Sequence, residues 1–222
     1  LYSDLIQNQQ KNQTQNTYQL TGNQRQDITL SITKKPEYLK LNTSTTTLIT
    51  DLTESNLSIQ TKREVAQRAL EFLENKLGTY PHPSILINQI EYDKYPVYGF
   101  NQLADFLNTF SDVFKWDVKL FKTLTKKYLE NTLNYQKQTD YWLVDGLQTY
   151  LMMQYIECYY PEVKAIGNIA NIWGLKSFNI SKLKFKDQFP YLFQLTSHAN
   201  LDQSLTTRAD SLSNFNRQII QK

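Results

Sequence analysis

The sequence predicts an α+β fold, in which a small N-terminal β-rich segment precedes a mostly helical domain. Three observations favour this order. Residues 27–33 and 38–50 alternate apolar and polar side chains and are rich in Thr and Ile, which is typical of strands. From residue 111 onward, apolar residues recur at helical spacing. Glycine is scarce, with 6 among 222 residues, whereas 15 Tyr and 11 Phe favour packed helices.

The composition along the chain divides it into three parts. Residues 1–16 are rich in Gln and Asn and are expected to be a polar, solvated lead-in. Residues 17–55 form the β-rich segment, and residues 56–222 form the helical domain. The chain begins at Leu1 without an initiator Met, so we expect it to be a fragment of a longer protein.

The helical domain is expected to contain six helices and one buried strand. Ser111 or Asp112 and Asp140 are predicted to cap the second and third helices, and Gly78 to end the first. A turn at residues 80–83 leads into the predicted strand at 84–90, and residues 94–103 form a loop. The predicted helices cover residues 61–77, 111–133, 141–157, 162–173, 187–197 and 208–220.

Charge and cysteine usage exclude several classes of function. The chain has 24 Lys and Arg against 21 Asp and Glu, and a net charge of +3 is too small for a nucleic-acid-binding surface. Its single cysteine, Cys158, excludes an internal disulfide and is predicted to be a small buried hydrophobe. No apolar run approaches the roughly 20 residues that span a bilayer. The compartment stays open, with the cell envelope or periplasm among the options.

Residues 142–150, W-L-V-D-G-L-Q-T-Y, carry a resemblance to a known family. They resemble the W-L-N-E-G-x-x-x-Y stretch of the aminopeptidase N-type zinc metallopeptidases, which are gluzincins with a thermolysin-like catalytic domain. In that family the Glu is the third zinc ligand and follows the H-E-x-x-H motif after eighteen intervening residues. Asp145 takes the place of this Glu, and counting back nineteen positions leads to Lys126 and four more to Lys122. The resemblance covers residues 23–161 as an ordered series of matches.

The loop at residues 98–103 lies where the family has its G-x-M-E-N loop. Gly99 matches the glycine, and Gln102 matches the glutamate that holds the free amino group of the substrate. The resemblance implies that this region forms the wall of the cleft beside the metal. Tyr98, Gly99 and Gln102 are therefore candidates for a residual substrate groove.

The residues that perform the chemistry in the family are all altered here. Lys122 and Lys126 replace the two histidines, and a lysine ammonium has no lone pair for zinc. Thr123 replaces the general-base glutamate, and its hydroxyl cannot accept a proton from water near neutral pH. The third ligand is shortened to Asp145. These four are degenerate positions, so we expect neither catalytic residues nor bound zinc.

The remaining histidines and the two lysines permit two structural hypotheses. His82 and His198 have no second ligand at i+3 or i+4 and are interpreted as exposed or locally hydrogen-bonded. Lys122 and Lys126 lie one helical turn apart, and one ammonium is hypothesised to replace zinc by pairing with the Asp145 carboxylate. The alternative is that the cleft is open and both lysines are solvated.

The function that the resemblance implies is that of a catalytically inactive metallopeptidase-like domain. Such a pseudoenzyme is expected to bind a peptide or protein partner, or to act as a scaffold, within a larger protein. Two alternatives stay open: an active metallopeptidase or aminopeptidase-type hydrolase whose missing metal ligands and catalytic tyrosine come from elsewhere, and a purely structural interaction domain. A deep, open groove favours peptide binding, and a collapsed or lysine-plugged cleft favours the structural role. The sequence leaves the natural ligand and the oligomeric state open.

Overall fold

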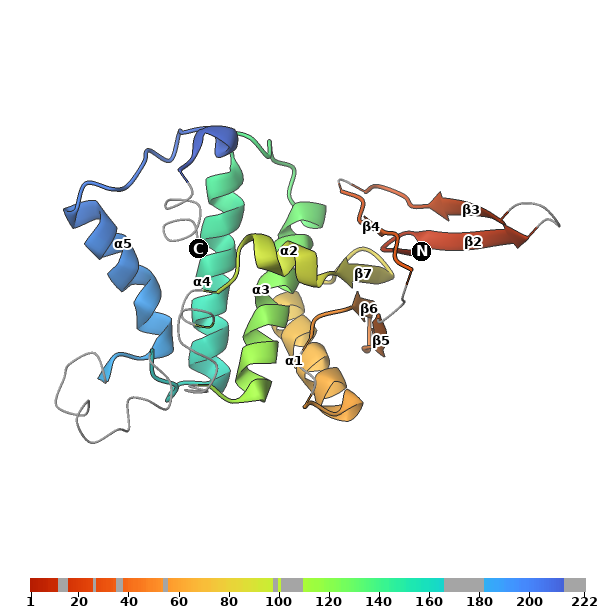
Figure 1. Ribbon diagram of the computed structural model, residues 1–222, viewed down its shortest axis with the longest axis horizontal. Helices are drawn as coiled ribbons and strands as arrows, with labels where there is room; N and C mark the ends of the chain where they lie inside the picture. Colours follow the sequence, from red (N-terminus) through yellow and green to blue (C-terminus); the bar gives the residue numbers. More distant parts are fainter. Residues whose placement is uncertain are drawn as a thin grey trace.

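Helices and strands occupy separate parts of the molecule, which confirms the predicted α+β class. Figure 1 shows the strands gathered at one end and the long helices α3 (Asp112–Thr132) and α4 (Tyr141–Tyr159) toward the other. The thermolysin-like assignment within this class stays a prediction. The structure is a computed structural model that describes residues 1–11, 16–25, 27–34, 38–53, 56–97, 100, 110–165 and 182–213.

A three-stranded sheet joins the strand-rich end to the helices. Its order is β5 (Leu39–Asn42), β6 (Thr47–Thr50) and β7 (Ser84–Ile87). β5 and β6 are antiparallel, whereas β6 and β7 are parallel and are joined by α1 (Ile59–Leu77), because parallel strands need a crossover connection. The strand predicted to reach residue 90 ends at Ile87, since α2 (Gln89–Lys94) begins two residues later.

The predicted end of α1 at Gly78 and the predicted cap of α3 at Ser111 are confirmed, whereas α1 begins two residues before the predicted start at residue 61. α1 begins after Ser58, whose Oγ accepts a hydrogen bond from the Thr61 N–H at 3.0 Å, and ends at Gly78, whose φ of 92° favours glycine. Ser111 caps α3 by accepting from the Phe114 N–H at 3.3 Å. Asp140 stands at the start of α4, but its carboxylate does not cap the helix. It accepts a hydrogen bond from the Gln136 N–H instead, at 3.0 Å.

The N-terminal residues contain strands that the sequence analysis did not predict within the polar lead-in. β1 (Tyr2–Ser3) pairs with β4 (Leu30–Ser31), and β2 (Ile6–Lys11) pairs with β3 (Asn16–Thr21). Figure 1 shows the β2–β3 hairpin projecting away from the helices. Ile6, Tyr18 and most other side chains of the hairpin whose burial the structure describes are exposed. Exposed strands need no apolar alternation, so a Gln- and Asn-rich sequence gives no strand signal there.

The later part of the chain agrees only in part with the predicted helices. α5 (Gln188–His198) confirms the helix predicted at 187–197. Residues 162–165 are not helical, and Lys164 forms an isolated β-bridge with Lys184. The rest of that predicted helix lies outside the described residues. Of the helix predicted at 208–220, the described part contains one short 3-10 turn, η5 (Ala209–Ser211). No helix in the described ranges combines the length and the apolar character that a membrane crossing needs.

The central element is α3, which packs against α1, α2, α4 and β7. Of its 21 residues, 14 are buried, so it lies inside the domain rather than on its surface. Aromatic side chains fill the space around it, and Phe121 of α3 stacks on Tyr155 of α4 with ring centroids 3.9 Å apart. Because α3 is buried on several sides, its polar side chains lose their hydrogen bonds to water and need hydrogen-bond or ion-pair partners within the protein.

Asp117 of α3 meets this requirement through a buried polar cluster. Its side chain has no exposed area, and it forms an ion pair with Arg68 of α1. The Tyr155 and Tyr160 hydroxyls donate to the same carboxylate at 2.9 and 2.7 Å. The Arg68 guanidinium also lies over the ring of Tyr159, 4.7 Å from its centroid. The cluster thus joins α1, α3 and the C-terminal end of α4.

We predict that Asp117→Ala lowers the free energy of unfolding by about 3–5 kcal/mol, because it leaves the Arg68 charge and two tyrosine hydroxyls without their acceptor. Urea unfolding followed by circular dichroism measures the change. Asp112→Ala on the same helix is the matched control. It removes a partly exposed pair with Lys115 at 3.0 Å and is expected to cost at most about 0.5 kcal/mol. Equal losses in the two variants contradict the role of the buried cluster.

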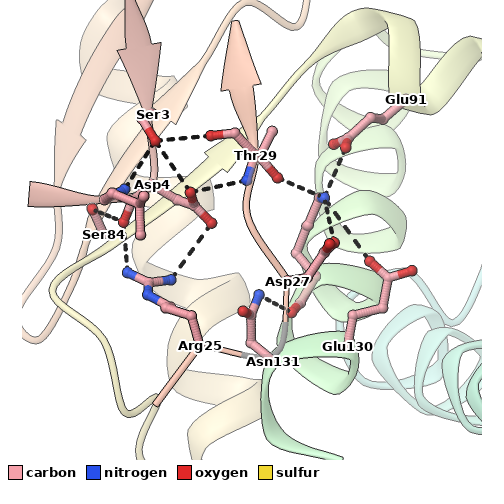
Figure 2. A network of polar contacts seen from close by, with 11 residues as sticks. Ser3, Asp4, Arg25, Asp27, Thr29, Ser84, Glu91, Glu130 and Asn131 are labelled. Atoms are coloured by element: carbon pink, nitrogen blue, oxygen red, sulfur yellow. Dashed lines mark hydrogen bonds and ion pairs between the residues drawn. The ribbon is translucent and has the colours of Figure 1, made fainter. Parts of the chain in front are cut away.

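A second polar network attaches the N-terminal segment to the helices (Figure 2). Asp4 accepts a hydrogen bond from the Thr29 N–H at 3.0 Å and forms an ion pair with Arg25 at 3.5 Å. The Ser84 hydroxyl of β7 donates to the Asp4 carbonyl at 3.0 Å. Ser3 and Asp4 are buried in this arrangement, so the first residues of the chain belong to the folded domain.

Lys127 of α3 forms the other half of this network. Its ammonium lies 2.8 Å from the Glu91 carboxylate, 3.5 Å from that of Asp27 and 3.9 Å from that of Glu130, and it donates to the Thr29 hydroxyl at 2.8 Å. Burial by itself lowers the pKa of this lysine, but the bond to Glu91 and the three carboxylates outweigh burial and raise it. One buried cation thus holds α2, α3 and the segment before β4 together.

We predict that Lys127→Met lowers the free energy of unfolding by about 3 kcal/mol, because carboxylates around the ammonium then lose their counter-ion. Hydrogen exchange at residues 27–31 is expected to become faster, since this segment loses its contact with α3. Lys137→Met is the control: Lys137 binds the same Asp27 at 3.0 Å but is 54% exposed, so we expect a change within about 0.5 kcal/mol. Unchanged exchange at residues 27–31 in Lys127→Met refutes the attachment.

Candidate functional site

A cleft of about 340 Å³ lies between α2, α3 and α4. Lys122, Thr123 and Lys126 line it from α3, and Asp145 lines it from α4. The four positions that the sequence analysis singled out therefore lie together at one cavity, although eighteen residues separate Lys126 from Asp145. The volume is at the lower end of the range for small-ligand sites, roughly 300–1,000 Å³.

Local helix geometry and one buried hydrogen bond bring these side chains together. Lys122 and Lys126 are four residues apart and share a face of α3. Asp145 and Gln148 are three residues apart and share a face of α4. The Gln148 side-chain amide donates to the Lys122 carbonyl at 2.6 Å, and both side chains are buried. This bond fixes the α4 face opposite the two lysines.

Both ammonium groups contact Tyr95, which follows α2. The Lys122 ammonium donates to the Tyr95 carbonyl at 2.7 Å, and the Lys126 ammonium lies over the Tyr95 ring, 4.7 Å from its centroid. Within the described residues, no ion pair of 4.0 Å or less joins either lysine to Asp145. The direct ion pair hypothesised from the sequence is not formed at this distance. The alternative, in which both lysines are solvated, does not hold for Lys122, because its side chain is buried.

Asp145 is a partly buried carboxylate that accepts no hydrogen bond from the residues described in this structure. Burial raises its pKa to about 6, and the charges of Lys126 and Lys122 only partly oppose this effect. The lysines are therefore close enough to act on Asp145 electrostatically without touching it.

Other charged residues of the cleft were not predicted from the sequence. Glu130 lies one turn after Lys126 on α3, and burial raises its pKa although Lys126 and Lys127 oppose the shift. Tyr95 and Gln148 were also missed. Glu130 and Gln148 could have been predicted, because the i,i+4 spacing from Lys126 and the i,i+3 spacing from Asp145 put them on the same helix faces. The position of Tyr95 could not, because it depends on how α2 packs against α3.

The donor set of the cleft does not fit the zinc ion that the resemblance implies. The Lys122 ammonium already acts as a hydrogen-bond donor, and the Thr123 hydroxyl donates to the Lys119 carbonyl at 3.0 Å. The ammonium has no lone pair for zinc where the family has imidazole, and the hydroxyl is not a base near neutral pH where the family has a carboxylate. Among the described residues, no group of three or more His, Cys, Asp or Glu side chains is arranged to hold a metal ion. No catalytic step through zinc follows from these residues.

The remaining sequence predictions concern the loop at residues 98–103 and the two histidines. Tyr98, Gly99 and Gln102 lie outside the described residues, so their place in a groove stays a prediction. His198 is exposed at the end of α5. His82 is buried beside Tyr80, with ring centroids 5.3 Å apart, and burial lowers its pKa.

Cys158 corrects a further prediction. It is exposed in the last turn of α4 rather than buried. Its environment is therefore that of a surface thiol.

No protein-family model, curated protein or solved structure matches this chain. The resemblance to the gluzincins accordingly rests on the motif spacing and stays a prediction.

We predict that Asp145→Asn raises the free energy of unfolding relative to the unmodified protein, and that this gain is about 1–2 kcal/mol larger at pH 7.5 than at pH 4. Because the folded pKa is raised, the native state keeps a proton that the unfolded state releases. The free energy of unfolding of the unmodified protein therefore falls as pH rises from about 4 to about 6. Asn carries no charge and removes this fall.

Urea unfolding at several pH values measures the effect. Asp202→Asn is the control, because Asp202 is exposed, and its stability curve is expected to follow that of the unmodified protein. A pH dependence that Asp145→Asn leaves unchanged contradicts the burial of this carboxylate.

Proposed function

We propose that this chain is a non-catalytic domain related to the gluzincin peptidases, and that its cleft binds a peptide or a protein segment. The observation that carries the proposal is the open cleft of about 340 Å³ at the four degenerate positions. A purely structural domain has no need of such a cleft, and natural cores are packed with few voids larger than a water molecule.

The arrangement of the helices supports the relation to the family. The resemblance requires that Lys122 and Lys126 lie on one helix face and that Asp145 approaches them from a second helix. All three line the same cavity, from α3 and α4. A small sheet with a parallel pair, β6 and β7, precedes these helices.

The chemistry of the cleft supports binding rather than hydrolysis. Two ammonium groups and a threonine hydroxyl stand at the positions of the family's ligands and base. A general base near neutral pH needs a group that takes up a proton, and neither Thr123 nor a lysine ammonium does so. Asp145 is the remaining acidic group of the four.

We predict that the four substitutions Lys122→His, Thr123→Glu, Lys126→His and Asp145→Glu create a zinc site that the unmodified protein lacks. If the helices keep the family geometry, the new imidazoles and carboxylate converge on one ion, and one zinc per chain binds with submicromolar affinity. Isothermal titration and metal analysis after dialysis measure affinity and stoichiometry.

A matched control places histidines at Lys115 and Lys119, with the same spacing on the same helix, together with Asp145→Glu. We expect this variant to bind zinc at least about 100-fold more weakly, because the glutamate is not opposite that pair. Equal zinc affinity in the two variants refutes the relation to the gluzincins. Stoichiometric zinc in the unmodified protein, with cleavage of aminoacyl reporter substrates, refutes the non-catalytic role.

A further inference from the structure

The charges that line the cleft are distributed unevenly. Five lysines and four carboxylates face it: Lys94, Lys122, Lys126, Lys127, Lys137, Asp27, Glu91, Glu130 and Asp145. Near β4 the opposite charges are paired directly, since Lys127 contacts Glu91 at 2.8 Å and Lys137 contacts Asp27 at 3.0 Å. That end of the cleft therefore offers little net charge to a ligand.

The end beside Tyr95 has an excess of positive charge. Lys94, Lys122 and Lys126 line it together with the carboxylates Asp145 and Glu130, and no contact of 4.0 Å or less joins either carboxylate to Lys122 or Lys126. Among these described residues, three cations and two anions leave one positive charge. Lys94 is exposed at the end of α2. Coulomb attraction inside a cleft is stronger than in bulk water, so this excess favours an anionic ligand.

The neutral donors around this end are already engaged within the protein. The Thr123 hydroxyl donates to the Lys119 carbonyl, the Gln148 amide to the Lys122 carbonyl, and the Tyr141 hydroxyl to the Thr207 carbonyl at 2.8 Å. The Lys126 ammonium differs from them, because its contact within the described residues is the face of the Tyr95 ring. An ammonium has three N–H donors, and a ring face satisfies none of them as an oxygen does.

We propose that the Tyr95 end of the cleft binds a carboxylate group of a peptide, with Lys126 as the direct partner and Lys122 as the supporting charge. This inference rests on the proposed binding function of the same cleft. A carboxylate carries one negative charge, which balances the local excess, whereas a phosphate dianion exceeds it. The volume of the cleft suits a segment of two or three residues, and Tyr92, Tyr141 and Val144 supply its apolar walls.

The test uses the folded 222-residue chain, labelled with ¹⁵N, and random-sequence N-acetyl tripeptide mixtures as probes. One mixture ends in a free carboxylate, a second ends in an amide, and a third ends in an amide but contains one Asp or Glu. Inorganic phosphate is the fourth probe. Shifts of the Gln148 side-chain amide report binding in the cleft, because this group lies between α3 and α4 beside Lys122.

We expect the free-carboxylate mixture, or the Asp- and Glu-containing mixture, to bind at least fivefold more tightly than the neutral amide. Tighter binding of the first mixture indicates a C-terminal carboxylate, and tighter binding of the second indicates an Asp or Glu side chain. Lys126→Met is expected to remove this difference while leaving binding of the neutral amide unchanged. Raising NaCl from 50 to 500 mM is expected to weaken the carboxylate probe and not the neutral one.

Lys137→Met is the matched control, because it removes the same charge from the same cleft at the paired end. It is expected to change the affinity of each probe by less than twofold. Thermal unfolding verifies that both variants remain folded. Equal effects of the two substitutions, or tighter binding of phosphate than of either carboxylate probe, overturn the inference.

The outcomes separate this inference from the proposed function. If the acidic and neutral mixtures bind equally and Lys126→Met changes neither, the cleft binds peptides without recognising a carboxylate. If no mixture changes the chemical shift of the Gln148 side-chain amide, the proposed peptide binding is refuted as well, and a structural role is the remaining function.

Discussion

The structure depends on the burial of α3 with its charged residues. A helix that packs against α1, α2, α4 and β7 has little solvent in which to place a charge. Asp117, Lys122 and Lys127 are nevertheless buried on it, so each needs compensation from a neighbouring element. Arg68 of α1 compensates Asp117, the Tyr95 carbonyl after α2 binds Lys122, and Glu91 of α2 binds Lys127. The packing of the surrounding elements is thus fixed by polar contacts as well as by apolar ones.

The same constraint distinguishes the cleft from the rest of the core. Asp117 has donors on every side, whereas Asp145 accepts no hydrogen bond within the described residues and has a pKa raised to about 6. Polar groups that are fully satisfied stabilise a fold, and those that are not satisfied mark places where a ligand gains binding energy. The proposed carboxylate recognition depends on a second group of this cleft, the Lys126 ammonium, whose contact within the described residues is the face of the Tyr95 ring.

The lysines of the cleft are held by the element that follows α2. The Tyr95 carbonyl accepts from the Lys122 ammonium, and the Tyr95 ring lies under the Lys126 ammonium. Lys127 joins α2 to α3 through Glu91 at 2.8 Å. The walls of the cleft on α2 and α3 are therefore connected by polar contacts of three lysines.

The α+β class, the end of α1 at Gly78, the cap of α3 at Ser111 and the helical spacing of Lys122 and Lys126 could be predicted from the sequence, because helical periodicity and capping residues are local properties. The parallel pairing of β6 and β7, the strands β1 and β2 and the contacts of both lysines with Tyr95 became known only from the tertiary structure. Strand partners and side-chain contacts join residues that are distant in the chain, and local patterns do not encode them. The partner of a lysine ammonium is set only when the helices are packed.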